Sequence, residues 1–294
     1  MEVSVIIVNY NCTELTKQAI KSIYNSGNNV NYEIIVVDNA STKADKDEII
    51  RFATEHDITL HLSKTNIGFG RANNIGAQYA KGEYLLLLNP DTILINNAID
   101  ILYNFAKSND IKICGGNLYD VKGNPTHSFW QVMPGILFEI SALCNNKNLK
   151  YKYHGNYEHN YSKKPIKVGY ITGADLMIGK EIYKKLDGFD GDYFIYFEET
   201  DLQYRARQMG IEAWSVPEAK ITHLESRTMV NFANKTKHFY QSRKVYFNKH
   251  KTATNARVAN TILLINCMLR RALFFILRNK EKQEYWRITQ ENIR

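Results

Sequence analysis

The sequence predicts an α/β fold in which a mostly parallel sheet carries helices on both of its faces. Strand-like and helix-like patterns alternate through residues 1–115 at the spacing of β–α repeats. The strand segments are continuous apolar runs, as is typical of strands buried on both faces of a sheet. Short polar segments follow several of these strands, at the edge where such sheets bind ligands.

The N-terminal half supplies most of this pattern. Residues 3–8 form the first apolar run, and residues 13–24 follow with apolar side chains at helical spacing. Further strands are predicted at 33–37, 58–62, 84–88 and 111–114. Further helices are predicted near 49–53, at 72–80 and at 98–106.

The C-terminal half is less regular. Residues 116–167 are rich in Asn, Tyr and Lys without a clear period, so we expect irregular structure that covers the site. Order resumes at 168–179, before a helix that ends near Gly188 and a helix at 199–209 that Gly210 closes. Short strands are expected at 211–216 and 220–224. We therefore predict a domain at 1–230 and a basic, amphipathic helical extension at 231–294.

The chain of 294 residues suits one large domain with an appendage. Its cysteines are far apart and lack zinc-site spacing, which favours reduced thiols: Cys12, Cys114, Cys144 and Cys267. A strand pattern begins directly after Met1, so no signal peptide is expected and the predicted location is the cytoplasm.

The net charge of +8 is concentrated near the C-terminus. Residues 226–280 contain twelve Lys or Arg and no Asp or Glu, which leaves a net charge of −4 on the rest. Residues 258–277 are mostly apolar, but adjacent Arg270 and Arg271 make a simple membrane span costly. We predict peripheral binding of the extension to the anionic inner face of the cell membrane, with a core helix as the alternative. Nucleic-acid binding is disfavoured because of the apolar run.

Polar side chains after the fourth strand predict a metal site. Asn89-Pro90-Asp91 places an amide and a carboxylate just outside the sheet, where Mg²⁺ or Mn²⁺ can bind together with substrate phosphates. His223 joins this site only if its strand brings it to Asp91. A type I turn explains the same motif without a metal.

The most unusual segment is acidic and follows an aromatic run. Glu198, Glu199 and Asp201 crowd the start of a helix after residues 193–197. A carboxylate in a partly apolar cleft can act as a general base. Helix capping by acidic side chains is the alternative. Gly68-Phe69-Gly70 begins a dinucleotide-binding fingerprint, but Asn73 occupies the third glycine position, so that interpretation is disfavoured.

Seven segments in order resemble the family 2 glycosyltransferases of the GT-A fold, in the bacterial rhamnosyltransferase-like branch. They are VSVIIVNYN, EIIVVDNAST, NIGFGRANNIG, GEYLLLLNPDT, YITGADLMIGKE, GFDGDYFIYFEETDLQYRARQMG and ITHL, and they span residues 3–225. The resemblance implies an inverting transfer of a sugar from a nucleoside diphosphate donor (UDP, dTDP or GDP) to a glycan or lipid-linked saccharide.

The resemblance also implies roles for individual residues. Donor binding is expected from Asn9, Tyr10, Asp38, Asn39, Gly68, Arg71, Asn73, Asn74, Asn89 and Asp91. Acceptor binding is expected from Gly173, Ala174 and Asp175. Asp91 and His223 are the expected metal ligands, and Glu199 is the expected base, beside Glu198 and Asp201.

Two positions depart from the family pattern. Asn89 replaces the first acidic residue of the metal motif, and Glu199 stands where the base is usually Asp. Glu198 is therefore kept as an alternative base. The rival functions are a sugar nucleotidyltransferase, which would need a glycine-rich basic loop after the first strand, and a non-catalytic carbohydrate- or membrane-binding module.

Overall fold

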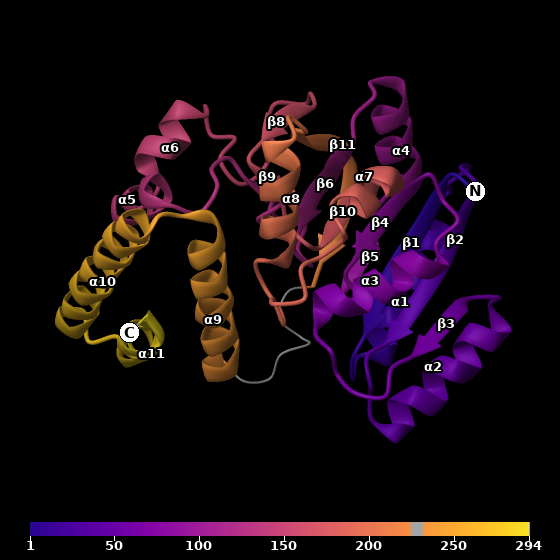
Figure 1. Ribbon diagram of the computed structural model, residues 1–294, viewed down its shortest axis with the longest axis horizontal. Coiled ribbons are helices and arrows are strands. Elements are labelled where there is room, and N and C mark those ends of the chain that lie inside the picture. The colour runs from indigo at the N-terminus through magenta and orange to yellow at the C-terminus, as the bar shows by residue number, and fades with distance from the viewer. Residues whose placement is uncertain (225–231, 294) are drawn as a thin grey trace.

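One mixed sheet forms the centre of the computed structural model, which describes residues 1–224 and 232–293 (Figure 1). Its strand order is β3-β2-β1-β4-β10-β6-β11-β5, with β8 paired to β11. The strands are β1 (Val3–Asn9), β2 (Tyr32–Asp38), β3 (Thr59–Leu62), β4 (Tyr84–Leu88), β5 (Thr92–Leu94), β6 (Ile113–Tyr119), β8 (Ile166–Val168), β10 (Asp175–Gly179) and β11 (Ala213–His223). Six of these nine strands run in one direction, whereas β5, β8 and β10 run in the other, which confirms the predicted fold class.

Helices cover both faces of the sheet because the strand residues alternate in direction. Val5 and Ile7 of β1 pack with α1 (Thr13–Asn25), α2 (Lys43–Glu55) and α4 (Ala98–Ser108) on one face. Ile6 belongs to a second core on the other face, which includes α7 (Lys180–Lys185) and α8 (Glu198–Gln208). The helix α3 (Phe69–Tyr79) lies on this face as well, where Gly76 lets it approach Ile6 closely.

The segment expected to be irregular is partly ordered. Two short helices, α5 (Ile136–Leu143) and α6 (Lys147–Lys152), lie within residues 116–167. A second, two-stranded sheet pairs β7 (Phe129–Trp130) with β9 (Tyr170–Ile171). The expectation missed these elements because they are too short to show a period. It also missed β5, and it divided β11, which is one strand with an irregularity between Ser215 and Lys220.

The C-terminal extension consists of α9 (Phe232–His250), α10 (Ala253–Ile276) and α11 (Lys280–Ile293), beside α5 and α6 in Figure 1. It packs on the rest of the chain. Tyr246 and Phe247 of α9 share a core with Tyr193 and Phe197, and α10 contacts α5. A buried ion pair joins α9 to α5, since Nη2 of Arg243 lies 2.8 Å from Oε1 of Glu139.

This ion pair predicts a measurable link between the extension and the body. Burial raises the pKa of Glu139, and the nearby Arg243 opposes that shift. Arg243→Met should lower the free energy of unfolding by about 3–5 kcal/mol, because it leaves a buried carboxyl unpaired. The loss should shrink at acidic pH, where protonation of Glu139 removes the buried charge. Urea unfolding measures both effects, and the exposed neighbour Lys244→Met is the control. Equal unfolding midpoints for the two variants would contradict the link.

Candidate active site

The carboxyl ends of β1 and β2 form the first part of the site. Parallel pairing places Asn9 opposite Asp38, and Nδ2 of Asn9 donates to Oδ1 of Asp38 at 2.9 Å. Both side chains are fully buried, and Oδ2 of Asp38 also accepts from the backbone N–H of Ser41. Tyr10 is 44% exposed and projects from the same strand end. Of these three predicted donor-binding residues, Tyr10 therefore offers the accessible surface, whereas Asn9 and Asp38 shape the edge beneath it.

The segment before α3 is attached to the same edge by Asn39. Oδ1 of Asn39 accepts from Ile67 N–H at 3.0 Å, and its Nδ2 donates to the Gly68 carbonyl at 3.3 Å. Gly68 has a φ of +90°, and a Cβ there would lie 2.4 Å from the carbonyl oxygen of Phe194. Only glycine fits this position, because both the backbone conformation and the contact exclude a side chain.

Three further predicted donor-binding residues lie on α3 and differ in what they reach. Arg71 is exposed and lies close to Gly191. Asn73 is buried and donates to the Phe69 carbonyl. Asn74 donates to the Phe189 carbonyl and accepts from Tyr183 and from Phe189 N–H. Arg71 is thus available to a ligand, whereas Asn73 and Asn74 hold protein segments in place.

Asp91 and His223 meet at the end of the sheet. Antiparallel pairing of β5 with β11 places His223 opposite Thr92, and its Nε2 lies 3.3 Å from Oδ1 of Asp91. The amide Nδ2 of Asn89 lies 3.5 Å from the same nitrogen. The strand therefore brings His223 to Asp91, which was the condition for including it.

The donor set of this corner fits a divalent cation. Across residues 1–224 and 232–293, no three His, Cys, Asp or Glu side chains form a metal-binding group. One carboxylate and one imidazole nitrogen are few ligands, but Mg²⁺ and Mn²⁺ usually complete their shell with water and substrate phosphates. The corner suits a cation that binds together with a diphosphate.

The loop before β10 connects this corner to α8. The Ala174 carbonyl accepts from Asn89 N–H at 2.9 Å, and a Cβ on Gly173 would lie 3.8 Å from the side chain of Glu199. Asp175 is fully buried, and its Oδ2 accepts from Gly116 N–H at 2.6 Å. Within the described part of the chain its Oδ1 has no hydrogen-bond partner, and burial raises the pKa of Asp175 to about 7. Asp175 lies beneath the loop, so Gly173 is the better placed to face an acceptor.

The acidic start of α8 contains two carboxyls with different access. Glu198 is buried, and its Oε2 has no hydrogen-bond partner among the described residues. Burial raises the pKa of Glu198 well above its usual range, and the charge of Glu199 raises it further. Glu199 is half-buried, and burial raises its pKa as well. The greater access of Glu199 and its position next to the open space above Gly173 favour it over Glu198 as the base.

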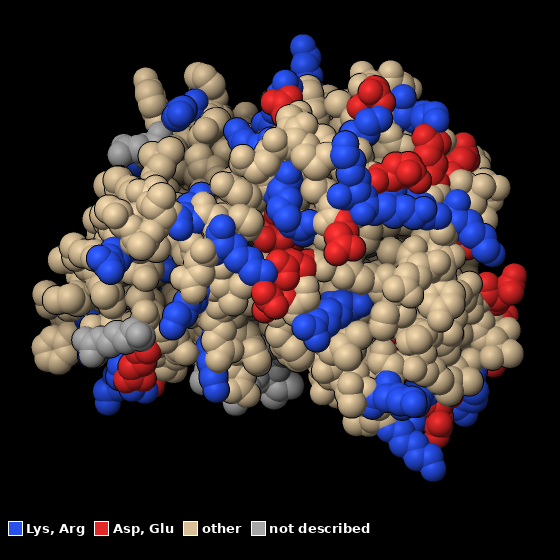
Figure 2. Space-filling model, viewed as in Figure 1, with Lys and Arg blue, Asp and Glu red and all other residues tan. Residues whose placement is uncertain are grey.

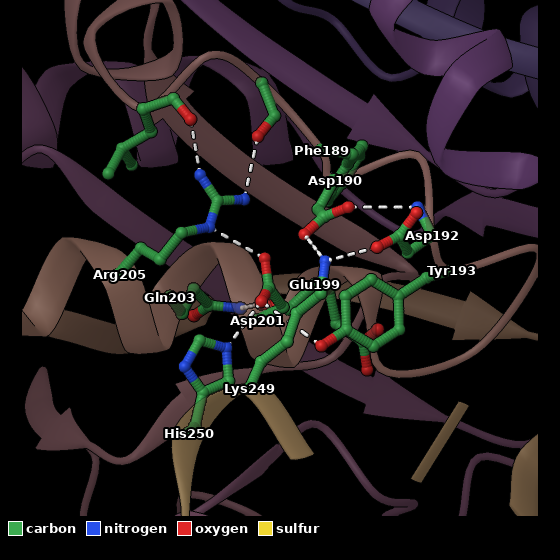
Figure 3. A network of polar contacts seen from close by, with 12 residues as sticks. Phe189, Asp190, Asp192, Tyr193, Glu199, Asp201, Gln203, Arg205, Lys249 and His250 are labelled. Carbon is green, nitrogen blue, oxygen red and sulfur yellow. Dashed lines mark hydrogen bonds and ion pairs between the residues drawn. The ribbon is translucent and has the colours of Figure 1, made fainter. Parts of the chain in front are cut away.

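Asp201 faces away from this position (Figure 3). Its carboxylate accepts from Nε of Arg205 at 2.7 Å, from Nε2 of His250 at 2.6 Å and from the Tyr193 hydroxyl at 3.2 Å. These contacts give Asp201 a structural role and do not support the predicted catalytic one. Sequence reasoning missed His250, which lies 49 residues away in a segment for which membrane binding was the preferred interpretation.

Comparisons with known proteins identify the family of this chain. The family model described as "Glycosyl transferase family 2" matches residues 4–187. The chain is 28% identical over 214 residues to the low-salt glycan biosynthesis hexosyltransferase Agl10 of Haloferax volcanii, which covers 71% of this chain and 63% of that relative. It is 23% identical over 243 residues to the rhamnosyltransferase WbbL of Escherichia coli K12, covering 79% of this chain and 87% of WbbL.

A solved structure shows the same fold. GalNAc-T7, crystallised with UDP, GalNAc and Mn²⁺, aligns over 84% of this chain and 49% of its own, with a TM-score of 0.59 and 17% identity. At that identity the likeness concerns the GT-A fold alone. The chain spans less than two thirds of Agl10.

The geometry at Asp91 predicts metal-dependent nucleotide binding. Mn²⁺ should strengthen the binding of a nucleoside diphosphate to the wild-type protein, because a cation at Asp91 and His223 offsets the phosphate charge. Asp91→Ala should bind the nucleotide equally with Mn²⁺ and with EDTA. Isothermal titration with UDP, dTDP and GDP measures this, and the exposed Glu181→Ala serves as control. Identical wild-type affinities with Mn²⁺ and EDTA for all three nucleotides would refute the metal site.

Proposed function

We propose a reaction for this chain, which belongs to glycosyl transferase family 2. The protein moves one sugar from a nucleoside diphosphate donor to a hydroxyl group of a saccharide acceptor, with inversion at the anomeric carbon. Family membership supports a role in glycan or polysaccharide synthesis. The inverting course, the nucleoside diphosphate donor and the saccharide acceptor are what the resemblance to this family implies, and the arrangement of the site is compatible with them.

The observation that carries this proposal is the two-residue bridge between the metal corner and the base. The backbone N–H of Asn89 donates to the Ala174 carbonyl, and a Cβ added to the preceding Gly173 would lie 3.8 Å from the Glu199 side chain. A donor diphosphate at Asp91 and an acceptor hydroxyl at Glu199 would therefore be held on the two sides of one short loop. Holding two reactants in this way supplies the proximity that a single displacement needs.

The chemistry of each side chain fits that displacement. The acceptor oxygen forms a bond to the anomeric carbon while the bond from that carbon to the diphosphate breaks. The carboxylate of Glu199 accepts the proton of the acceptor hydroxyl, and burial makes it a stronger base than an exposed Glu. A divalent cation held by Asp91 and His223 would neutralise charge on the departing diphosphate. Tyr10 offers an exposed ring to the nucleotide base, and Arg71 offers an exposed cation beside Gly191 for an anionic part of the donor.

The rival functions lack comparable support. A nucleotidyltransferase would need a glycine-rich, basic loop after β1, whereas this chain has Asn9, Tyr10 and Asn11 there. A non-catalytic module leaves one buried and one half-buried carboxyl at the start of α8 without a function, although burying a carboxyl costs free energy.

The extension supports placement of this reaction at a membrane surface. The helix α10 is long and apolar enough to cross a membrane by length and composition, yet only 22% of its most apolar window is buried. Its outward side carries Ile265, Met268, Leu269, Leu273 and Ile276, all exposed. In Figure 2 the left part of the molecule, where the extension lies, shows blue cationic side chains scattered over tan surface.

We place this apolar stripe of α10 in the headgroup region of an anionic leaflet. An exposed apolar face beside excess Lys and Arg suits that location. Arg270 and Arg271 oppose a full span. Peripheral binding at the cytoplasmic face would bring the site to a lipid-linked saccharide acceptor.

The proposed role of Glu199 as the base gives the first test of the function. With the nucleotide sugar that the wild-type protein consumes, Glu199→Gln should lower transfer about 10²–10⁴-fold, the contribution of a general base, with donor affinity unchanged. Wild-type transfer should rise with pH as Glu199 loses its proton, because burial raises its pKa. Product formation and donor titration measure the two quantities.

The same assay can also contradict the assignment of Glu199 as the base. Glu198→Gln is the matched variant, and we expect it to retain more activity than Glu199→Gln. Loss of transfer in Glu198→Gln with normal turnover in Glu199→Gln would move the base to Glu198. If the wild-type protein consumes no nucleotide sugar, the proposed glycosyltransferase function is refuted.

The proposed membrane binding of the apolar stripe of α10 gives the second test. The wild-type protein should co-sediment with vesicles of phosphatidylglycerol and phosphatidylcholine at low salt, and high salt should weaken binding by screening the charges. Leu269→Glu should weaken vesicle binding about tenfold, because it removes an apolar contact and adds a repelled charge. Thr254→Glu adds the same charge at an exposed position near the start of α10 and should bind like the wild type. A wild-type protein that stays in the supernatant at low salt would refute the membrane placement.

A further inference from the structure

The end of α9 is bound to the segment around the start of α8 by polar contacts that the proposed chemistry does not use (Figure 3). Nε2 of His250 lies 2.6 Å from Oδ1 of Asp201. Nζ of Lys249 contacts the carboxylate of Asp190 and lies 2.7 Å from Oδ2 of Asp192. Asp190 and Asp192 belong to the loop that leads into α8, so α9 holds both the loop and the first turn of the helix.

A strained turn in this loop is held by the same helix. Tyr196 and Phe197, which directly precede Glu198, both have a φ of +67°. Bulky residues rarely adopt positive φ, and each such conformation costs about 1–3 kcal/mol unless the surroundings fix it.

Aromatic rings of α9 provide those surroundings. Phe239 packs on Tyr196 and Phe197 with ring centroids 5.9 and 5.1 Å apart, and Tyr246 packs on Phe197 at 5.5 Å. Ser242 adds a hydrogen bond to the Ile195 carbonyl at 2.7 Å. Contacts from α9 therefore stabilise the turn at residues 195–197, which sets the direction of the Glu198 and Glu199 side chains.

We propose that His250 and Lys249 are positioning residues for the transfer reaction. This inference rests on the proposed role of Glu199. Asp201 lies two residues after Glu199 in the same helical turn, so the two side chains point to different sides of α8. The hydrogen bond from His250 to Asp201 fixes the orientation of the first turn of α8 about the helix axis. The ion pairs of Lys249 with Asp190 and Asp192 fix the loop that precedes α8. Together they keep Glu199 beside Gly173.

The expected signature is a loss in turnover and not in donor binding. We propose that the donor is held mainly by the ends of β1, β2 and β4, whereas the polar contacts of His250 and Lys249 go to Asp201, Asp190 and Asp192. A displacement of about 1 Å at a reacting group can lower the rate about 10²-fold. We therefore expect kcat to fall while the KM for the donor stays the same.

The experiment compares variants of the full chain in the transfer assay. His250→Ala should lower kcat at least about tenfold, and His250→Gln should restore much of it, because the Gln amide can donate to Asp201. Lys249→Met should lower kcat to a smaller extent. Lys244→Met removes an exposed cation from the same helix and should match the wild type. Thermal unfolding of each variant reports whether it is folded.

The outcomes separate this inference from the function on which it rests. Absence of transfer by the wild-type protein refutes the proposed function, and the inference falls with it. Wild-type transfer together with an unchanged kcat in folded His250→Ala refutes the inference alone. If His250→Ala does not fold, Lys249→Met decides: a lowered kcat at constant donor KM supports the inference, and a kcat equal to that of Lys244→Met overturns it.

Discussion

The parallel, in-register pairing of β1 with β2 and β4 is the constraint on which the rest of the structure depends. It aligns the carboxyl ends of three neighbouring strands, so Asn9, Asp38 and Asn89 arrive at one edge although they are far apart in sequence. The strands are apolar on both faces and must be covered on both, which places α1 and α3 on opposite sides. The polar edge is then the part of the sheet that stays open to ligands.

Two kinds of support hold the candidate site. The nucleotide side is fixed by buried hydrogen bonds among residues of the first 75 positions, such as Asn9 with Asp38 and Asn39 with Gly68. The acceptor side depends on a helix start whose geometry is set by α9, more than 30 residues later in the chain. The same extension thus has an exposed apolar side, which we propose binds a lipid surface, and an aromatic side that packs on the turn before α8.

The sequence was informative where local pattern decides structure. Continuous apolar runs predicted β1, β2 and β4, and the resemblance to the family predicted one site that contains Asp91 and Glu199. It was less informative where long-range packing decides. The three residues of β5 form a strand only because β11 lies beside them, and that pairing is what brings His223 to Asp91. The contact of His250 with Asp201 had no sequence signal, because a lone histidine in a basic helix is usually a surface residue.

The backbone contact between Gly68 and Phe194 limits how this enzyme can be redesigned. Phe69 N–H donates to the Phe194 carbonyl at 2.8 Å, so the donor segment and the aromatic run before the acidic helix form one interlocked wall. A library that varies Gly68 would yield mostly misfolded proteins, whatever nucleotide it was selected for. Tyr10 and Arg71 are both exposed, so under the proposed function they are the positions at which to search for altered donor preference.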